Sequence, residues 1–168
     1  MKYWLNENIS SFHLYHFELG VAKQTKSPIM LTKEIMELVV PSQEELIALG
    51  RWFGEGMTGN EVYALSGPLG SGKTTFVKGL ALGLGIEDNI ISPTFVLVRE
   101  YKGRYPLFHF DWYRIETQKE VLELGYYDYL EHIGVKVIEW PEKYSSLIPE
   151  SARWIKIAIE GSNRKVTW

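Results

Sequence analysis

A glycine-rich stretch in the middle of the chain has the residue types and the spacing that bind nucleotide phosphates. Residues 65–76 read LSGPLGSGKTTF, in which Gly67, Gly72, Lys73 and Thr74 fit the pattern G-x-x-x-x-G-K-[ST]. Glycines allow positive φ and bring backbone amides close to phosphate oxygens, and the following helix directs its free N–H groups at the same anion. The lysine adds a positive charge for the β- and γ-phosphates, and the threonine hydroxyl is a ligand for Mg²⁺. The stretch therefore predicts a phosphate-binding loop, with an ordinary glycine-rich turn as the alternative.

Two acidic residues are candidates for the metal side of such a site, which lies at the carboxyl ends of neighbouring strands. The apolar segment VKVIEW carries Glu139 near its end, and the segment LFHFDWYR places His109 and Asp111 on one strand face. Other interpretations stay open. Glu139 could be a solvated strand end, Asp111 could pair with Arg114 or cap a helix, and His109 could be a packed, hydrogen-bonded residue.

The sequence SPTF, residues 92–95, is a third candidate and lies about twenty residues after Lys73. Pro93 keeps Ser92 extended, which separates this segment from the preceding helix. The Thr94 hydroxyl then belongs to an ordered loop that can reach the γ-phosphate or Mg²⁺. Loops of this kind change their order on hydrolysis in nucleotide switches, although SPT alone is also a common turn.

Alternating strand and helix patterns surround these motifs. Ser42 is a natural helix N-cap with Glu45 three residues on, and Leu46, Leu49 and Phe53 then share one helix face. We expect helices over 42–57, 72–85 and 118–130. We expect strands over 37–42, 61–67, 94–101, 105–113, 135–140, 154–160 and 164–168. This order favours a mixed sheet with helices on its faces.

Composition limits the function classes. The chain has 168 residues, a net charge of −3 and no cysteine, which excludes disulfides, cysteine–zinc sites and thiol catalysis. The charge argues against strong binding of nucleic acid by this chain alone. No apolar run is long enough for a membrane span and the start is a poor signal peptide, so we expect a cytoplasmic protein. Residues 1–35 are expected to be a poorly ordered appendage, and residues 36–168 a single domain.

The kind of nucleotide enzyme is narrowed by the motifs that the sequence lacks. It contains neither the D-x-x-G and N-K-x-D motifs of GTPases nor the L-S-G-G-Q signature of transporter ATPases. The middle of the chain also lacks the arginine-rich lid of small-metabolite kinases. These observations favour a compact ATPase that drives a partner. A small-molecule kinase and a non-catalytic, nucleotide-binding adaptor are the alternatives.

Five segments in this order resemble the TsaE (YjeE) family, the ATPases of bacterial tRNA threonylcarbamoyladenosine synthesis. They are LSGPLGSGKTTFVKGLALGLGI, ISPTFVLVREY, LFHFDWYRI, ELGYYDYL and VIEWPEK, and the resemblance runs from about Met36 to Trp168. It implies a P-loop NTPase-like, three-layer αβα fold with a mixed parallel and antiparallel sheet. It also implies weak, Mg²⁺-dependent ATP hydrolysis that is activated in a complex.

The resemblance further implies two protein partners, a threonylcarbamoyl-transferase subunit and its inactive paralogue (TsaD and TsaB type). The ATPase would reset this complex between cycles of modifying adenosine 37 in tRNAs that read codons starting with A. It would not transfer the group itself, and it would meet tRNA only through the complex.

Site residues carry over from the family by position. The resemblance implies ATP binding by Gly67, Gly70, Ser71, Gly72, Lys73, Thr74 and Thr75, with Gln43 beside the base. It implies Mg²⁺ ligation by Thr74 and Glu139, a switch-like role for Thr94, and a place for Asp111 beside the γ-phosphate or the attacking water. Pro68 departs from the family, whose members commonly have an acid at this position.

Several aromatic residues have two interpretations. Trp112, Tyr126 and Tyr127 are candidates for a protein-docking face, with core packing as the alternative. Trp140 follows Glu139 directly, so it either reports on the site or packs plainly.

Overall fold

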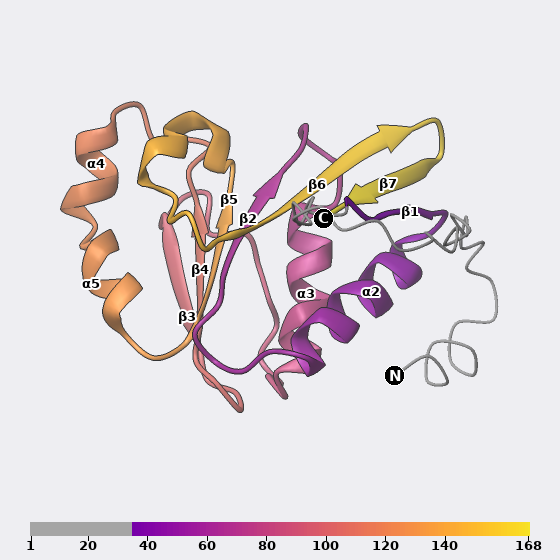
Figure 1. Ribbon diagram of the computed structural model, residues 1–168, viewed down its shortest axis with the longest axis horizontal. Helices are drawn as coiled ribbons and strands as arrows, with labels where there is room; N and C mark the ends of the chain where they lie inside the picture. The colour runs from indigo at the N-terminus through magenta and orange to yellow at the C-terminus, as the bar shows by residue number, and fades with distance from the viewer. Residues whose placement is uncertain (1–34) are drawn as a thin grey trace, which may run out of the picture.

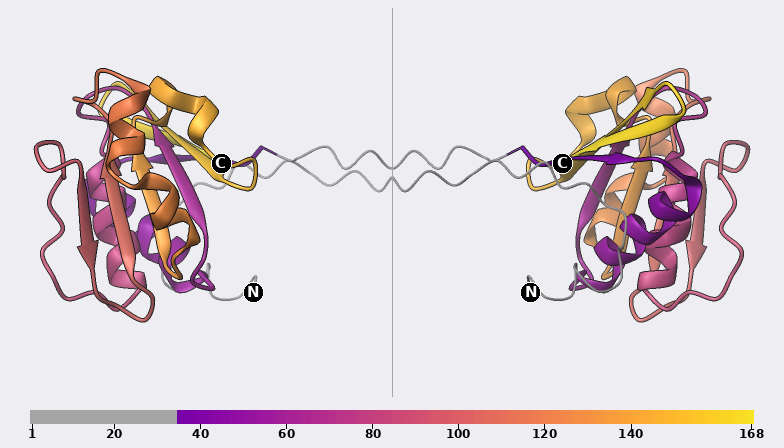
Figure 2. Two further views of the ribbon diagram at one scale, coloured as in Figure 1. Left: turned by 90° about the vertical axis from the view of Figure 1, so that its left-hand side faces the viewer. Right: turned by 90° about the vertical axis from the view of Figure 1, so that its right-hand side faces the viewer.

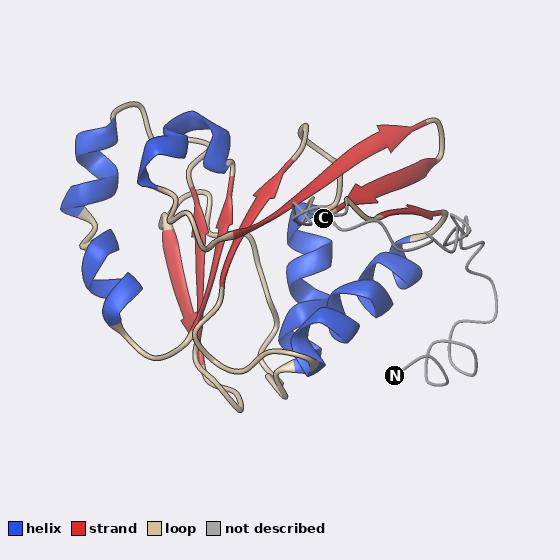
Figure 3. Cartoon of the chain, in the orientation of Figure 1, coloured by secondary structure: helices blue, strands red, loops and turns tan. Residues whose placement is uncertain are grey.

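A seven-stranded mixed sheet forms the centre of the computed structural model, which describes residues 35–168 (Figures 1 and 3). The strand order is β1-β7-β6-β2-β5-β4-β3. The strands are β1 (Glu37–Val40), β2 (Val62–Ser66), β3 (Val98–Tyr101), β4 (Leu107–Asp111), β5 (Val135–Glu139), β6 (Arg153–Glu160) and β7 (Asn163–Thr167). The four central strands β6, β2, β5 and β4 are parallel, whereas the β1–β7, β7–β6 and β4–β3 pairs are antiparallel. The predicted mixed sheet is confirmed.

Helices cover both faces of this sheet. They are α2 (Gln43–Glu55), α3 (Lys73–Gly83), α4 (Gln118–Glu123), α5 (Tyr126–Glu131) and the 3₁₀ helix η1 (Pro141–Leu147). Figure 1 shows α2 and α3 on one side of the sheet and α4 and α5 on the other. The side views in Figure 2 show the C-terminal hairpin of β6 and β7, in yellow, beside the short strand β1. The predicted three-layer αβα arrangement is confirmed, and the expected appendage, up to residue 34, lies outside the described residues.

Helix α2 forms as its sequence predicts. The Ser42 hydroxyl accepts a hydrogen bond from the Glu45 backbone N–H at 3.2 Å, which satisfies one of the free donors of the first turn. Leu46, Leu49 and Phe53 are all buried on the face that packs against the sheet and α3. The helix therefore has a fixed start, next to the phosphate-binding loop.

Two expected elements differ from the structure. The predicted helix over 118–130 is broken at Gly125, whose φ of 73° ends α4 and starts α5. The predicted strand over 94–101 begins only at Val98, because the Leu97 N–H donates to the Pro93 carbonyl in a turn and Leu97 has a φ of 69°. In both places the apolar pattern of the sequence continues, but a residue with positive φ interrupts the helix or delays the start of the strand.

The hydrophobic core has one part on each side of the sheet. The first part lies between the sheet and α2 and α3, and the second packs α4, α5 and η1 against the other face. Trp112 and Tyr126 are fully buried in the second part, so a docking role for these two rings is wrong. Tyr127 is exposed.

Helices α2 and α3 approach so closely that glycine is required at their crossing. A Cβ atom on Gly79 would lie 2.0 Å from the Ile47 carbonyl oxygen, and one on Gly50 would lie 2.2 Å from the Phe76 carbonyl oxygen. The approach fixes α3, whose first residue is Lys73, against a second element at the level of the backbone. None of the helices in the described part of the chain has the length and the apolar character that crossing a bilayer requires.

We predict that Gly79→Ala lowers the free energy of unfolding by about 2 kcal/mol, because the clash forces the helices apart. This value is the net effect: the clash has to outweigh the gain of about 1 kcal/mol that replacing glycine by alanine brings in a helix interior. Gly56→Ala is the matched control, since a Cβ atom there meets nothing closer than 3.6 Å. Denaturant unfolding followed by circular dichroism measures both variants. Equal unfolding midpoints for the two would contradict the packing account.

Candidate functional site

The phosphate-binding loop joins the end of β2 to the start of α3 with its glycines in left-handed conformations. Gly67 has a φ of 146°, and a Cβ atom there would lie 2.3 Å from the Ile157 carbonyl oxygen on β6. Gly72, the N-cap of α3, has a φ of 103°, and a Cβ atom there would lie 2.6 Å from a Leu46 methyl group on α2. Both positions thus need glycine for backbone angle and for space. The free N–H groups at the start of α3 suit an anion.

The Lys73 side chain folds back into this loop. Its ammonium donates to the carbonyl oxygens of Gly67 at 2.8 Å and Pro68 at 3.1 Å. The same nitrogen lies 3.8 Å from the centre of the Trp140 ring, in a cation–π contact. Trp140 itself has a φ of 61°, an uncommon angle for a bulky residue, and its ring contacts the Tyr113 ring at a tilt of 42°. The structure therefore places Trp140 at the site, beside the lysine.

The charge of Lys73 reflects two opposing influences. Burial of the side chain lowers its pKa, whereas the carboxylates of Glu139, Glu142 and Asp111 favour the charged form and raise it. The net direction is downward. Burial destabilises the charged form of Lys73, and the nearby carboxylates offset this effect only in part. Such a cation suits a site that binds a further negative charge, such as phosphate.

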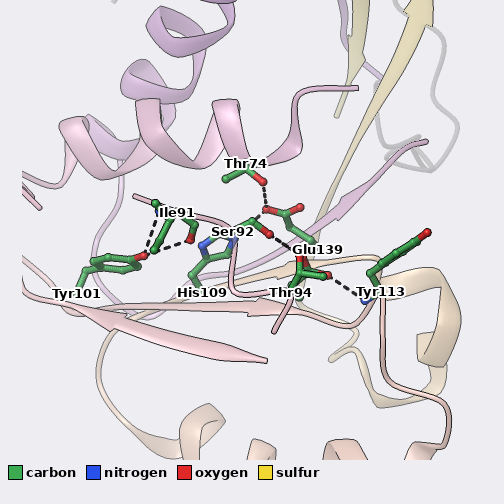
Figure 4. A network of polar contacts seen from close by, with 9 residues as sticks. Thr74, Ile91, Ser92, Thr94, Tyr101, His109, Tyr113 and Glu139 are labelled. Atoms are coloured by element: carbon green, nitrogen blue, oxygen red, sulfur yellow. Dashed lines mark hydrogen bonds and ion pairs between the residues drawn. The ribbon is translucent and has the colours of Figure 1, made fainter. Parts of the chain in front are cut away.

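Thr74, Glu139 and His109 meet at one carboxylate oxygen (Figure 4). The Thr74 hydroxyl donates to Glu139 Oε1 at 2.8 Å, and His109 Nε2 lies 2.9 Å from the same oxygen. The side chains of Glu139 and His109 are almost completely buried. Glu139 is thus not a solvated strand end, and His109 is a packed, hydrogen-bonded residue as one interpretation expected.

Asp111 holds the SPTF segment at the end of β4. Its Oδ2 accepts hydrogen bonds from the Ser92 hydroxyl at 2.9 Å and the Thr94 hydroxyl at 2.5 Å, and its Oδ1 accepts one from the Tyr113 N–H at 2.9 Å. Figure 4 shows Ser92 and Thr94 next to Glu139. Within residues 35–168 no ion pair joins Asp111 to Arg114, whose guanidinium lies over the Phe95 ring instead.

Strand register explains why residues so far apart meet. Asp111 on β4 and Leu65 on β2 are both paired with Glu139 on β5. Three parallel strands therefore end at one level, and the phosphate-binding loop leaves β2 at that level. The structure thus brings together Lys73, Thr74, Thr94, Asp111 and Glu139, as the sequence predicted they would lie.

The oxygen donors here suit a Mg²⁺ ion that a nucleotide brings with it. Mg²⁺ is usually held by one or two protein oxygens and completed by phosphates and water. The Thr74 hydroxyl and the Glu139 carboxylate provide such oxygens side by side. Among the residues that the structure describes, no group of three or more His, Asp or Glu side chains could hold a metal ion by itself. The residues fit a nucleotide-bound metal and not a site built by protein alone.

A hollow of about 190 Å³ continues from the loop toward the start of α2. Its lining includes Gly70, Ser71, Gly72 and Thr75 from the loop and α3, and Gln43 from α2. Lys73 is not among the residues that line it. The structure therefore places Gln43 and Thr75 together, as the family pattern implies.

Sequence reasoning missed Arg164 on β7, which also lines this hollow. Its guanidinium donates to the Ser71 and Gly70 carbonyl oxygens at 3.0 and 3.2 Å. No motif surrounds Arg164 in the sequence, so only the tertiary structure shows its place beside the loop.

Comparisons with known proteins agree with this geometry. The family model of "Threonylcarbamoyl adenosine biosynthesis protein TsaE" matches residues 40–166. The chain is 39% identical over 133 residues to the tRNA threonylcarbamoyladenosine biosynthesis protein TsaE of Treponema pallidum. The aligned residues cover 79% of this chain and 98% of that protein. It is 44% identical over 119 residues to the protein of the same name from a Nostoc species, covering 68% of this chain and 73% of that protein.

A solved structure shows the same fold. The crystal structure of Bacillus subtilis YdiB superposes with a TM-score of 0.67 at 30% sequence identity, covering 80% of this chain and 84% of that one. The sheet is therefore that of a P-loop NTPase-like α/β fold. Since the family model spans most of the described residues and the relatives match over most of their length, the chain belongs to the TsaE family.

Proposed function

We propose that this chain is the ATP-binding, weakly ATP-hydrolysing subunit that formation of threonylcarbamoyladenosine at position 37 of tRNA requires. The observation that carries the proposal is the contact between Thr74 and Glu139 at the end of a complete phosphate-binding loop. The proteins that it resembles are named for tRNA threonylcarbamoyladenosine biosynthesis. Residues 36–168 would form one ATPase domain, and the tRNAs would be those that read codons starting with A.

Nucleotide binding would rest on the loop and on α2. Amides of residues 70–75 surround the phosphates, and Lys73 exchanges its contacts with the loop carbonyls for the β- and γ-phosphates. The Thr75 and Gln43 side chains border the hollow where the ribose and base would lie. Gly67 permits the turn through which the loop leaves β2.

Hydrolysis would depend mainly on positioning and electrostatics. Thr74 and Glu139 would hold Mg²⁺, which neutralises charge on the β- and γ-phosphates when it is bound. Asp111 would lie beside the γ-phosphate or the attacking water and would keep Thr94 within reach through the hydrogen bond that it accepts. His109 would keep the Glu139 carboxylate oriented.

We propose that the isolated chain hydrolyses ATP only weakly, and the position of Arg114 supports this. Phosphoryl transfer is often accelerated by an arginine that reaches the transferring group. Arg114, the arginine closest in sequence to Asp111, stacks on Phe95. We propose that a partner protein completes or activates the site. The two partners would be a transferase subunit of the TsaD type and its inactive paralogue of the TsaB type. The chain's net charge of −3 suits contact with tRNA only through that cytoplasmic complex.

We predict that Lys73→Ala abolishes ATP binding, because the buried cation that faces the phosphates is lost. Glu139→Ala should retain binding but require a Mg²⁺ concentration raised by about tenfold or more, because one of two protein oxygens for the metal is lost. Calorimetric titration of ATP at a series of Mg²⁺ concentrations separates the two effects. Unchanged binding and unchanged Mg²⁺ dependence in both variants would show that the site is assigned wrongly.

The role in tRNA modification has its own test. With the two partner proteins, tRNA and threonylcarbamoyl donor present, we expect the wild-type chain to support many rounds of modification per complex. Lys73→Ala should permit about one round, because the complex is not reset. Modified nucleoside, quantified by mass spectrometry against enzyme, measures this number. Equal yields of modified nucleoside with and without the chain would contradict the proposal. If ATP turnover produced a phosphorylated metabolite in place of free phosphate, the chain would be a kinase instead.

A further inference from the structure

Within residues 35–168, every hydrogen bond of the Arg164 guanidinium goes to a backbone carbonyl. Nε donates to Ser71 O at 3.0 Å and Nη2 to Gly70 O at 3.2 Å. Nη1 donates to Asn163 O at 3.1 Å and to Ser162 O at 3.4 Å. The Nε and Nη2 edge of this planar group thus holds two successive carbonyls of the phosphate-binding loop, and Nη1 holds Ser162 in the turn before β7 and Asn163 at its start.

Holding a carbonyl also orients the amide on the other side of the same peptide plane. In a trans peptide the C=O of one residue and the N–H of the next point in opposite directions. When Arg164 binds the Ser71 carbonyl, the Gly72 N–H is therefore directed away from Arg164. This N–H belongs to the N-cap of α3, where anions bind. We propose that Arg164 is a positioning residue that holds the phosphate-binding loop in its anion-binding form.

The sheet supplies the rigidity that this role needs. Arg164 is paired with Ile159 on β6 and with Val40 on β1, so its backbone is fixed from both sides. The loop also contacts β6 directly, since Gly67 lies against the Ile157 carbonyl. The guanidinium binds two carbonyls through donors in a rigid planar fork, whereas the donors of a lysine ammonium rotate.

The charge of Arg164 adds to the effect. None of the ion pairs found in the described portion of the chain includes Arg164, so its positive charge is not matched by a carboxylate within 4.0 Å. Arg164 lines the hollow that Thr75 also lines. A second cation beside the loop raises the local potential for a nucleotide anion.

The proposal rests on nucleotide binding at this loop, and two variants with a matched control test it. Arg164→Lys keeps the charge but loses the fork, and Arg164→Gln loses both. Lys165→Gln is the control, because Lys165 is the next residue on β7 and its ion pair with Glu37 lies away from the loop. Calorimetric titration with ADP and Mg²⁺ should show a Kd raised about tenfold or more in both Arg164 variants, because charge-assisted hydrogen bonds to the loop are lost. The control should bind as the wild type does.

Hydrogen exchange of the full chain without nucleotide provides a readout that separates loop positioning from general destabilisation. We expect faster exchange in peptides that cover residues 67–74 and unchanged exchange in β6 and β7. Wild-type affinity in Arg164→Lys would show that charge alone suffices and would overturn the proposal, as would faster exchange throughout the hairpin. If the wild-type chain itself does not bind ADP, the proposed function fails; if it binds and both Arg164 variants match it, only the role of Arg164 fails.

Discussion

The hydrogen bond between Thr74 and Glu139 connects the two parts of the chain that make the site. Thr74 is the second residue of α3 and Glu139 is the last residue of β5, 65 positions later in the sequence. The bond forms because Leu65, Asp111 and Glu139 lie at one level across three parallel strands. A shift of register by one residue in β5 would turn the Glu139 side chain to the opposite face of the sheet. The site thus depends on sheet register more than on any loop.

The elements around this bond fix the phosphate-binding loop from several directions. Helix α2 packs on α3 through glycine contacts that allow backbone to touch backbone. On the other side of the loop, Arg164 binds its carbonyls from the C-terminal hairpin. Lys73 is consequently held between a loop of carbonyls and the Trp140 ring, in a place where burial lowers its pKa and the nearby carboxylates partly restore it. Because the loop and Lys73 are ordered before a nucleotide binds, less conformational entropy is lost on binding.

The sequence predicts the parts of this site that a motif or a strand end indicates, and it misses those that depend on tertiary contacts alone. The phosphate-binding loop is found because its glycines, lysine and threonine act within eight consecutive positions. Glu139 is found because it ends an apolar strand segment, and Asp111 because alternation places it with His109 on one face of its strand. The break at Gly125 and the turn at Leu97 are missed, because apolar periodicity continues through both. Arg164 is missed because its partner Ser71 is 93 residues away and no spacing links the two.

Phosphate release from ATP tests most directly the claim that this loop and its two carboxylates form an ATPase site completed by partners. The measurement compares the purified chain alone with the chain mixed with the transferase subunit and its inactive paralogue, at saturating Mg²⁺ and ATP. The account predicts slow release by the chain alone and release raised by at least about tenfold in the mixture, which corresponds to about 1.4 kcal/mol of additional transition-state stabilisation. Release at one rate, with or without the partners, would contradict it.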